Sequence, residues 1–136
     1  MDELLLRAQK ALRRYQGNKV NAEATNSNIV ITTASRKTLE VYSEISNGQL
    51  TFYCVVVGAA KIRNIFHQDG IADLIWRRNR ELRLVRFLLD DRGRLSIKIT
   101  LPEKVSDAIL AWGLVLLANE AARLGFVLMG PQKEVG

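Results

Sequence analysis

The stretch TLEVYSEISNGQLTFYCVVV, residues 38–57, decides the fold that the sequence predicts. Its first half alternates apolar and polar positions, which is the pattern of a strand with one buried face. Asn47-Gly48 follows, a dipeptide that tolerates the positive φ angles of a type I′ turn, and the second half is dense in Phe, Tyr and Val. The stretch therefore predicts a β-hairpin, in which the first strand has Leu39, Val41 and Ile45 on one face and Glu40, Tyr42 and Glu44 on the other.

The chain before this hairpin predicts a helix, a loop and a short strand. Over residues 2–15, apolar residues recur at spacings of one, three and four, and basic residues occupy the opposite side, which indicates an amphipathic helix. Residues 18–28 are mostly polar and without pattern, so we expect a loop there. Residues 29–33 are a short strand candidate.

The chain after the hairpin predicts a helix, two strands and a last helix. Residues 59–68 are either a helical turn or irregular. The clearest alternation in the chain follows later, where Leu95, Ile97, Ile99 and Leu101 face inward. The expected elements are a helix from Asp69 to about Asn79, strands at 82–89 and 94–101 joined by a turn at 90–93, and a helix that begins near Ser106 and closes at Gly125.

These elements give the order α-β-β-β-α-β-β-α. Short turns link the strands within each group, which favours antiparallel pairing. We therefore predict an α+β fold with a mainly antiparallel five-stranded sheet and helices packed on one face. The 136 residues leave room for one domain, which we place at residues 1–130, with a C-terminal tail at 131–136.

The composition indicates a cytoplasmic protein. The single cysteine, Cys54, excludes an intrachain disulfide and fits a reducing compartment. The start, Met1-Asp2-Glu3, is acidic where a secretory signal is basic. The most apolar stretch, residues 108–118, is shorter than the roughly 20 residues that a bilayer span needs, so we expect no membrane partner.

Catalytic and metal-binding patterns are weak in this sequence. Cys54 and the only histidine, His67, cannot supply the four or so ligands of a structural zinc site. Asp90 and Asp91 are adjacent carboxylates, and with Gly93 they match what a hairpin turn needs. We predict no catalytic residue, no metal and no cofactor; a small hydrolase centred on His67 is kept as a third hypothesis.

Residues 77–98 carry eight basic residues against three acidic ones, in a chain of net charge +6. Such a run could neutralise phosphates, and nucleic-acid binding is the alternative function. Only one aromatic residue, Phe87, lies on these strands, so stacking with bases has little support, and a solvated face or an acidic protein partner is favoured. The candidate basic patch consists of Arg83, Arg86, Arg94 and Lys98.

The last helix is apolar on every side over residues 108–118. A helix of this kind must be buried on every side, whereas the terminal helix of a two-layer domain leaves one side wet. Either the first helix covers the surplus, or a second subunit or a bound peptide does; we favour the latter. The candidate partner or dimer surface is formed by Trp76, Ile109, Trp112 and Leu116, because Trp is enriched at interface hot spots.

The segments IADLIWRRN (residues 71–79) and LRLVRFLLD (82–90), followed by a final helix near Val105-Ser106, resemble the YbjN-like proteins and the type III secretion chaperones. The resemblance covers residues 71–124 well and the N-terminal half by element order. It implies one shared α+β fold and a small, often dimeric module that holds extended peptide segments of other proteins without a cofactor. This chain is basic where secretion chaperones are typically acidic. The leading hypothesis is a non-enzymatic, chaperone-like peptide- or protein-binding module that acts as a homodimer.

Overall fold

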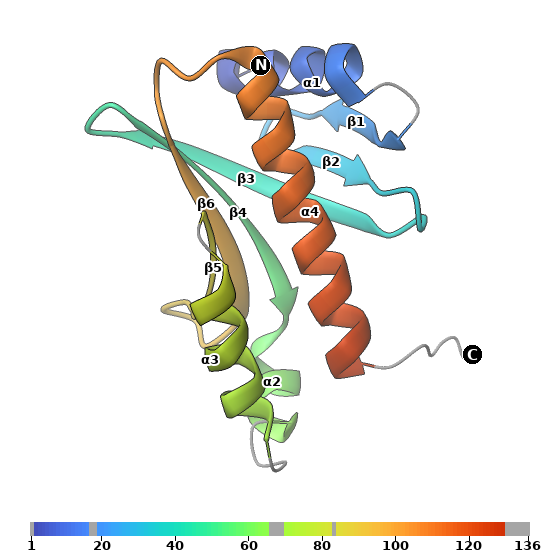
Figure 1. Ribbon diagram of the computed structural model, residues 1–136, viewed down its shortest axis with the longest axis vertical. Coiled ribbons are helices and arrows are strands. Elements are labelled where there is room, and N and C mark those ends of the chain that lie inside the picture. Colours follow the sequence, from blue (N-terminus) through green and yellow to red (C-terminus); the bar gives the residue numbers. More distant parts are fainter. Residues whose placement is uncertain (1, 17–18, 66–69, 83, 130–136) are drawn as a thin grey trace.

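The computed structural model describes residues 2–16, 19–65, 70–82 and 84–129. One antiparallel sheet runs in the order β1-β2-β3-β4-β6-β5, and the helices cover one of its faces (Figure 1). The α+β class, the antiparallel pairing and the one-sided helices are thus confirmed. The elements are α1 (Glu3–Gln16), β1 (Asn21–Ala24), β2 (Ile29–Thr32), β3 (Thr38–Ser46), β4 (Gln49–Val57), α2 (Ala59–Ile65), α3 (Ile71–Glu81), β5 (Val85–Leu89), β6 (Leu95–Pro102) and α4 (Asp107–Met129).

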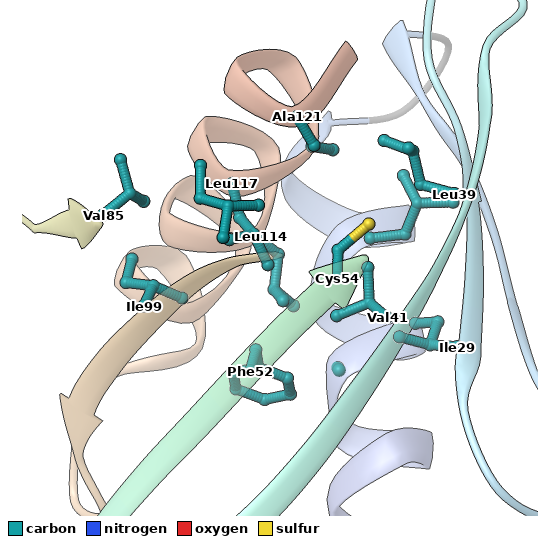
Figure 2. Close-up of a cluster of buried hydrophobic side chains, with 14 of the residues drawn as sticks. Ile29, Leu39, Val41, Phe52, Cys54, Val85, Ile99, Leu114, Leu117 and Ala121 are labelled. Atoms are coloured by element: carbon teal, nitrogen blue, oxygen red, sulfur yellow. The ribbon is translucent and has the colours of Figure 1, made fainter. Parts of the chain in front are cut away.

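The central hairpin forms as the sequence predicts. Asn47 and Gly48 have φ angles of 53° and 76°, which are the two positive values of a type I′ turn, and Ser46 pairs with Gln49 across it. Because side chains alternate across a strand, Leu50, Phe52 and Cys54 of β4 lie on one face and are buried. Figure 2 shows Phe52 and Cys54 in the hydrophobic cluster with Leu114 and Leu117 of α4. The hairpin therefore supplies the centre of the core.

The core lies between the sheet and the two long helices α1 and α4. Gly113 of α4 lies directly over β6: a Cβ atom at this position would come within 3.0 Å of the Ile99 side chain and 3.3 Å of that of Leu101. The lack of a side chain thus lets α4 approach the sheet closely. Both helices bury one full stripe, made of Leu4, Leu5, Ala8, Ala11 and Leu12 in α1 and of Leu110, Leu114, Leu117, Ala121 and Leu124 in α4.

The sequence prediction is wrong in its strand count and in several boundaries. The sheet has six strands because part of the predicted loop, Asn21–Ala24, pairs with β2 as β1; its single buried residue is Ala22, which gave no apolar pattern. The segment at 59–68, which the sequence left undecided, forms the helix α2 over Ala59–Ile65, and its remaining residues lie outside the described ones. Strand β5 begins at Val85 instead of residue 82, because Leu82 is the C-cap of α3.

The last helix is also longer than predicted, because α4 continues past Gly125 to Met129. Gly125 does not end the helix; it packs close to β4, where a Cβ atom on this residue would lie 3.9 Å from the Val56 side chain. The start of α4 is confirmed: the Ser106 hydroxyl accepts a hydrogen bond from the backbone N–H of Ile109 at 3.2 Å. His67, Asp69, Arg83 and the predicted tail at 131–136 lie outside the described residues.

Each edge strand of the sheet is capped by an amide side chain from a helix. At the β1 edge, the Gln9 carbonyl of α1 accepts the backbone N–H of Ala24 at 2.6 Å. At the β5 edge, the Asn79 side chain of α3 accepts the N–H of Phe87 at 2.7 Å and donates to its carbonyl at 2.8 Å. These bonds occupy backbone groups that an edge strand otherwise leaves open.

Candidate functional site

A stripe of apolar side chains runs along the side of α4 that faces away from the sheet. Its four most open members are Ile109, Trp112, Phe126 and Val127, which are 48%, 50%, 59% and 48% exposed. Val115 and Leu116 lie between them and are half-buried. We call these six residues the α4 stripe. They are apolar on the wet side of the helix, where an ordinary surface helix carries charge.

The α4 stripe is held in place by polar contacts near the start and the middle of the helix. At the start, Arg7 of α1 donates from Nε to the Asp107 carboxylate at 2.7 Å and also to the backbone carbonyl of Val105. In the middle, Arg78 of α3 donates to the Glu120 carboxylate, from Nε at 3.1 Å. The helix is therefore anchored independently of its outward face.

The pair between Arg78 and Glu120 joins α3 to α4 in a partly dry environment. Glu120 is only 6% exposed, and its bond to Arg78 raises the pKa of that guanidinium further above its usual range, with a smaller contribution from Glu81. A buried carboxylate needs such a partner, because burying an unpaired charge is costly. The pair thus fixes α3 beside α4.

Of the four predicted surface residues, Ile109, Trp112 and Leu116 belong to the α4 stripe. Trp76 lies on α3 and is 59% exposed, with the Arg80 guanidinium 4.9 Å from the centre of its ring. That arrangement is a cation–π contact. The partner role of these four residues remains a prediction.

The length and composition of α4 also satisfy the criterion for a membrane span, contrary to the sequence expectation. The segment Asp107–Leu128 has 22 residues and a mean hydropathy of 1.4. The length argument from the sequence was too narrow because it counted residues 108–118 alone. More than half of the segment, 56%, is buried inside the fold, and the core helix of a soluble protein meets the same criterion.

The basic run at residues 77–98 is divided between two sides of the molecule. Arg78 faces α4, and Arg77 pairs with Asp73 at 2.6 Å on α3. Arg86 and Lys98 lie opposite each other on β5 and β6, and both point outward from the open sheet face. Phe87, the one aromatic residue of these strands, is buried.

The open face of the sheet carries a groove that the sequence reasoning missed. Its volume is about 1000 Å³, and it is lined by outward residues of β3, β4 and β6 with the β5–β6 turn. Two of them, Tyr42 and Tyr53, stack with ring centres 5.5 Å apart. We call this the outer groove. Tyr42 and its neighbours were placed on one face of their strand, but only the pairing of β4 with β6 brings the basic strand beside them.

The Asp90 carboxylate organises the turn at one end of the outer groove, as the sequence predicts. It accepts the backbone N–H groups of Arg92 and Arg94 at 2.9 and 3.0 Å, the Arg94 Nε at 2.8 Å and the Ser96 hydroxyl at 3.3 Å. These bonds, the backbone N–H of Arg94 first, lower the pKa of Asp90. Gly93 follows with a φ of 75°.

Burial keeps Cys54 neutral. It raises the pKa of the thiol to about 12, with a smaller contribution from the charge of Glu40, so the thiolate does not form near neutral pH. Within residues 2–16, 19–65, 70–82 and 84–129, no three His, Cys, Asp or Glu side chains come together as metal ligands would.

Two solved structures share this arrangement of strands and helices. One is the type III secretion chaperone SycH of Yersinia pestis, in complex with a stable fragment of YscM2: it is 18% identical, covers 86% of this chain and 96% of that one, and has a TM-score of 0.53. The other is the ExsC–ExsE complex, at 14% identity, 97% and 100% coverage and a TM-score of 0.50. The chain has the fold of a type III secretion chaperone.

The likeness lies in the fold alone at these identities. No family model and no curated protein sequence matches this chain. For the secretion-chaperone fold, the resemblance drawn from residues 71–90 is therefore confirmed, whereas its YbjN-like half remains a prediction. The secretion-chaperone-like fold here carries two distinct open surfaces, the α4 stripe on the helix side and the outer groove on the opposite side of the sheet.

Proposed function

We propose that the protein is a non-enzymatic, chaperone-like module that binds an apolar segment of a partner protein, and that it acts as a cytoplasmic homodimer. The α4 stripe is the observation that carries this proposal. Four large apolar side chains there are about half exposed or more, two near the start of the helix and two near its end, with the exposed polar residues Asn119 and Arg123 between them. Exposed apolar side chains that gather into one patch mark interaction sites more often than scattered ones do.

The fold does not need the α4 stripe. The opposite side of α4 already fills the core with Leu110, Leu114, Leu117 and Leu124, all fully or almost fully buried. Arg7 and Arg78 hold the helix from outside the stripe. The four open members of the stripe therefore leave about half of their surface in water within one copy, and a partner supplies the further burial that their composition favours.

Aromatic residues in the stripe suit the role of anchors. Trp112 and Phe126 are large, rigid side chains of the kind that dominate interface energetics. The shared fold supports the same function, because SycH was solved with a fragment of another protein bound to it. The exposed arginines, such as Arg77 and Arg80, would attract acidic stretches of a partner and raise the association rate.

The homodimer is tested by light scattering on size-exclusion fractions over a dilution series. We expect the mass of two chains at tens of micromolar, and a shift to one chain for Trp112→Ser. Trp76→Ser reports whether the exposed Trp of α3 takes part. Tyr15→Ser is the matched control, because Tyr15 is an exposed aromatic residue on α1, outside both helices under test. A wild-type protein that remains monomeric at these concentrations contradicts the homodimer.

Partner binding is tested with a photo-crosslinking amino acid at position 112, and at the exposed position 14 of α1 as the control. We expect a discrete crosslinked polypeptide other than a second copy of the chain at position 112, and none at position 14. Crosslinking to the same chain alone reduces the proposal to self-association. A crosslink to nucleic acid in its place favours the alternative function.

A further inference from the structure

The outer groove has a floor and two flanks. Its floor is β4, whose outward residues Thr51, Tyr53 and Val55 lie between the outward residues of β3 and those of β6. Neighbouring strands are about 4.8 Å apart, so the two flanking strands are about 10 Å apart. This spacing matches the width of one extended polypeptide with side chains on both sides. Three alternate residues of a strand span about 13 Å, which is the length of four or five extended residues.

The two flanks carry opposite charges. On β3, Glu40 and Glu44 line the groove; on β6, Lys98 does, with Arg86 next to it in register on β5. Among the residues that the structure describes, these four are in no ion pair. Arg94 also lines the basic flank, but its charge is matched by Asp90 at 2.8 Å.

The floor between the flanks is aromatic and polar. Tyr42 and Tyr53 stack across the β3–β4 pairing, and the register continues from Tyr53 to Lys98. No described residue forms a hydrogen bond with either tyrosine hydroxyl. Tyr42 thus lies on the acidic flank between Glu40 and Glu44, and Tyr53 lies on the floor next to Lys98, where the two side chains can bind the backbone of a chain.

We propose that the outer groove binds an extended segment of a partner protein in which acidic and basic residues alternate. Side chains of an extended chain point alternately to the two sides. A segment lying along β4 therefore directs every second residue toward Glu40 and Glu44 and the others toward Lys98, with Arg86 beyond it. Alternating charges satisfy both flanks at once. The inference rests on the proposed protein-binding function and adds a second surface, on the opposite face from the α4 stripe.

Other occupants fit the outer groove less well. The lining holds four carboxylates, Glu40, Glu44, Asp90 and Asp91, and three basic groups, Arg92, Arg94 and Lys98, so a polyanion such as nucleic acid meets repulsion. A second copy offers complementary charges, but two hollow faces leave space between them. The groove is also open along its length, whereas small-molecule sites enclose most of their ligand.

The test uses fluorescently labelled six-residue peptides and the full chain, with anisotropy as the readout at low ionic strength. The probe alternates Glu and Lys, and its control is a block peptide of the same composition, with three Glu followed by three Lys. Hexaglutamate and a short single-stranded RNA complete the set. We expect the alternating peptide to bind about fivefold more tightly than the block peptide, which corresponds to about 1 kcal/mol of exposed ion pairing.

Charge reversal on the two flanks sharpens the test. Glu44→Lys and Lys98→Glu should each weaken the alternating peptide about fivefold, and the double exchange should recover part of the loss, because the peptide can shift by one residue. Lys61→Glu is the control for Lys98→Glu: it makes the same change of charge at an exposed position on α2 and should leave binding unchanged. The Trp112→Ser variant should bind the peptide normally, which separates failure of the outer groove from failure of the α4 stripe.

Three results would overturn the proposal. Equal binding of the alternating and block peptides removes the role of charge order. Tightest binding of hexaglutamate or of the RNA makes the groove an anion site. Self-association that Glu44→Lys abolishes, and that mixing Glu44→Lys with Lys98→Glu protein restores, assigns the groove to a second copy.

Discussion

The helices α1 and α4 pack on the same face of one sheet, yet their outward sides differ completely. Both bury a full apolar stripe, and the two stripes meet in one core. The outward side of α1 carries Lys10, Arg13 and Arg14, whereas that of α4 carries the α4 stripe. Because the inward sides already satisfy the fold, the difference on the outward sides does not arise from folding. The proposed contact of a partner with the outward side of α4 accounts for this difference.

The largest effect on the free energy of unfolding is expected for substitutions on the buried, inward sides of the two helices. Leu114→Ala in α4 and Leu12→Ala in α1 should each lower the free energy of unfolding by about 3 kcal/mol, because both residues are fully buried and the cavity cannot close. Urea denaturation at one fixed protein concentration measures both. A loss below about 1 kcal/mol in only one helix would mean that this helix contributes little to the core.

An intermediate effect concerns the ion pairs that hold the two helices. Glu120→Ala should lower the free energy of unfolding by about 2–3 kcal/mol. The loss is smaller than for a fully buried ion pair because Arg78 is partly exposed. In α1, Arg13→Ala removes an exposed pair with Glu23, at 3.7 Å, and should cost less than about 0.5 kcal/mol. The same urea curves apply.

A double variant separates the charge from the packing at that site. Arg78→Met with Glu120→Leu should regain most of the stability that Glu120→Ala loses, since no charge is then left unpaired. If the double variant is as unstable as the single one, the site depends on the shape of the two side chains and not on the guanidinium that Glu120→Ala leaves without its partner.

The smallest effect on stability is expected on the outward sides. Phe126→Ser in α4 and Lys10→Ser in α1 should each change the free energy of unfolding by about 0.5 kcal/mol or less, because both side chains are exposed. Retention on a hydrophobic-interaction column should fall for Phe126→Ser and stay unchanged for Lys10→Ser. Marked unfolding of Phe126→Ser would show that the stripe stabilises the chain itself, and the contrast between the helices would then have a structural origin.

Much of the fold could be predicted because its signals are local. Asn47-Gly48 specified the turn, and alternation in residues 38–46 specified which face of β3 is buried. The strand β1 escaped prediction because its four residues contain one buried alanine and gain their structure from pairing with β2. The end of α4 was misplaced because Gly125 was interpreted as a helix terminator, whereas the helix continues through it to Met129.

The two candidate surfaces also differ in whether the sequence alone could predict them. The α4 stripe could be predicted, because a helix that is apolar on every side has more apolar residues than one buried face needs, and this is visible in its own sequence. The outer groove could not, because it depends on β4 and β6 becoming neighbours although the α2 and α3 segments separate them in the chain. The alternation that placed Glu40 and Glu44 on one face was visible; the strand order that sets Lys98 across from them was not.

The amide caps on the two terminal strands have a consequence for crowded solutions. Gln9 and Asn79 form hydrogen bonds with backbone groups through which the sheet of one molecule could pair with the sheet of another. A protein with exposed apolar residues is prone to aggregate. Here the hydrogen bonds from Gln9 and Asn79 oppose strand addition at both edges of the sheet. Any assembly is thereby directed to side-chain contacts instead of strand pairing.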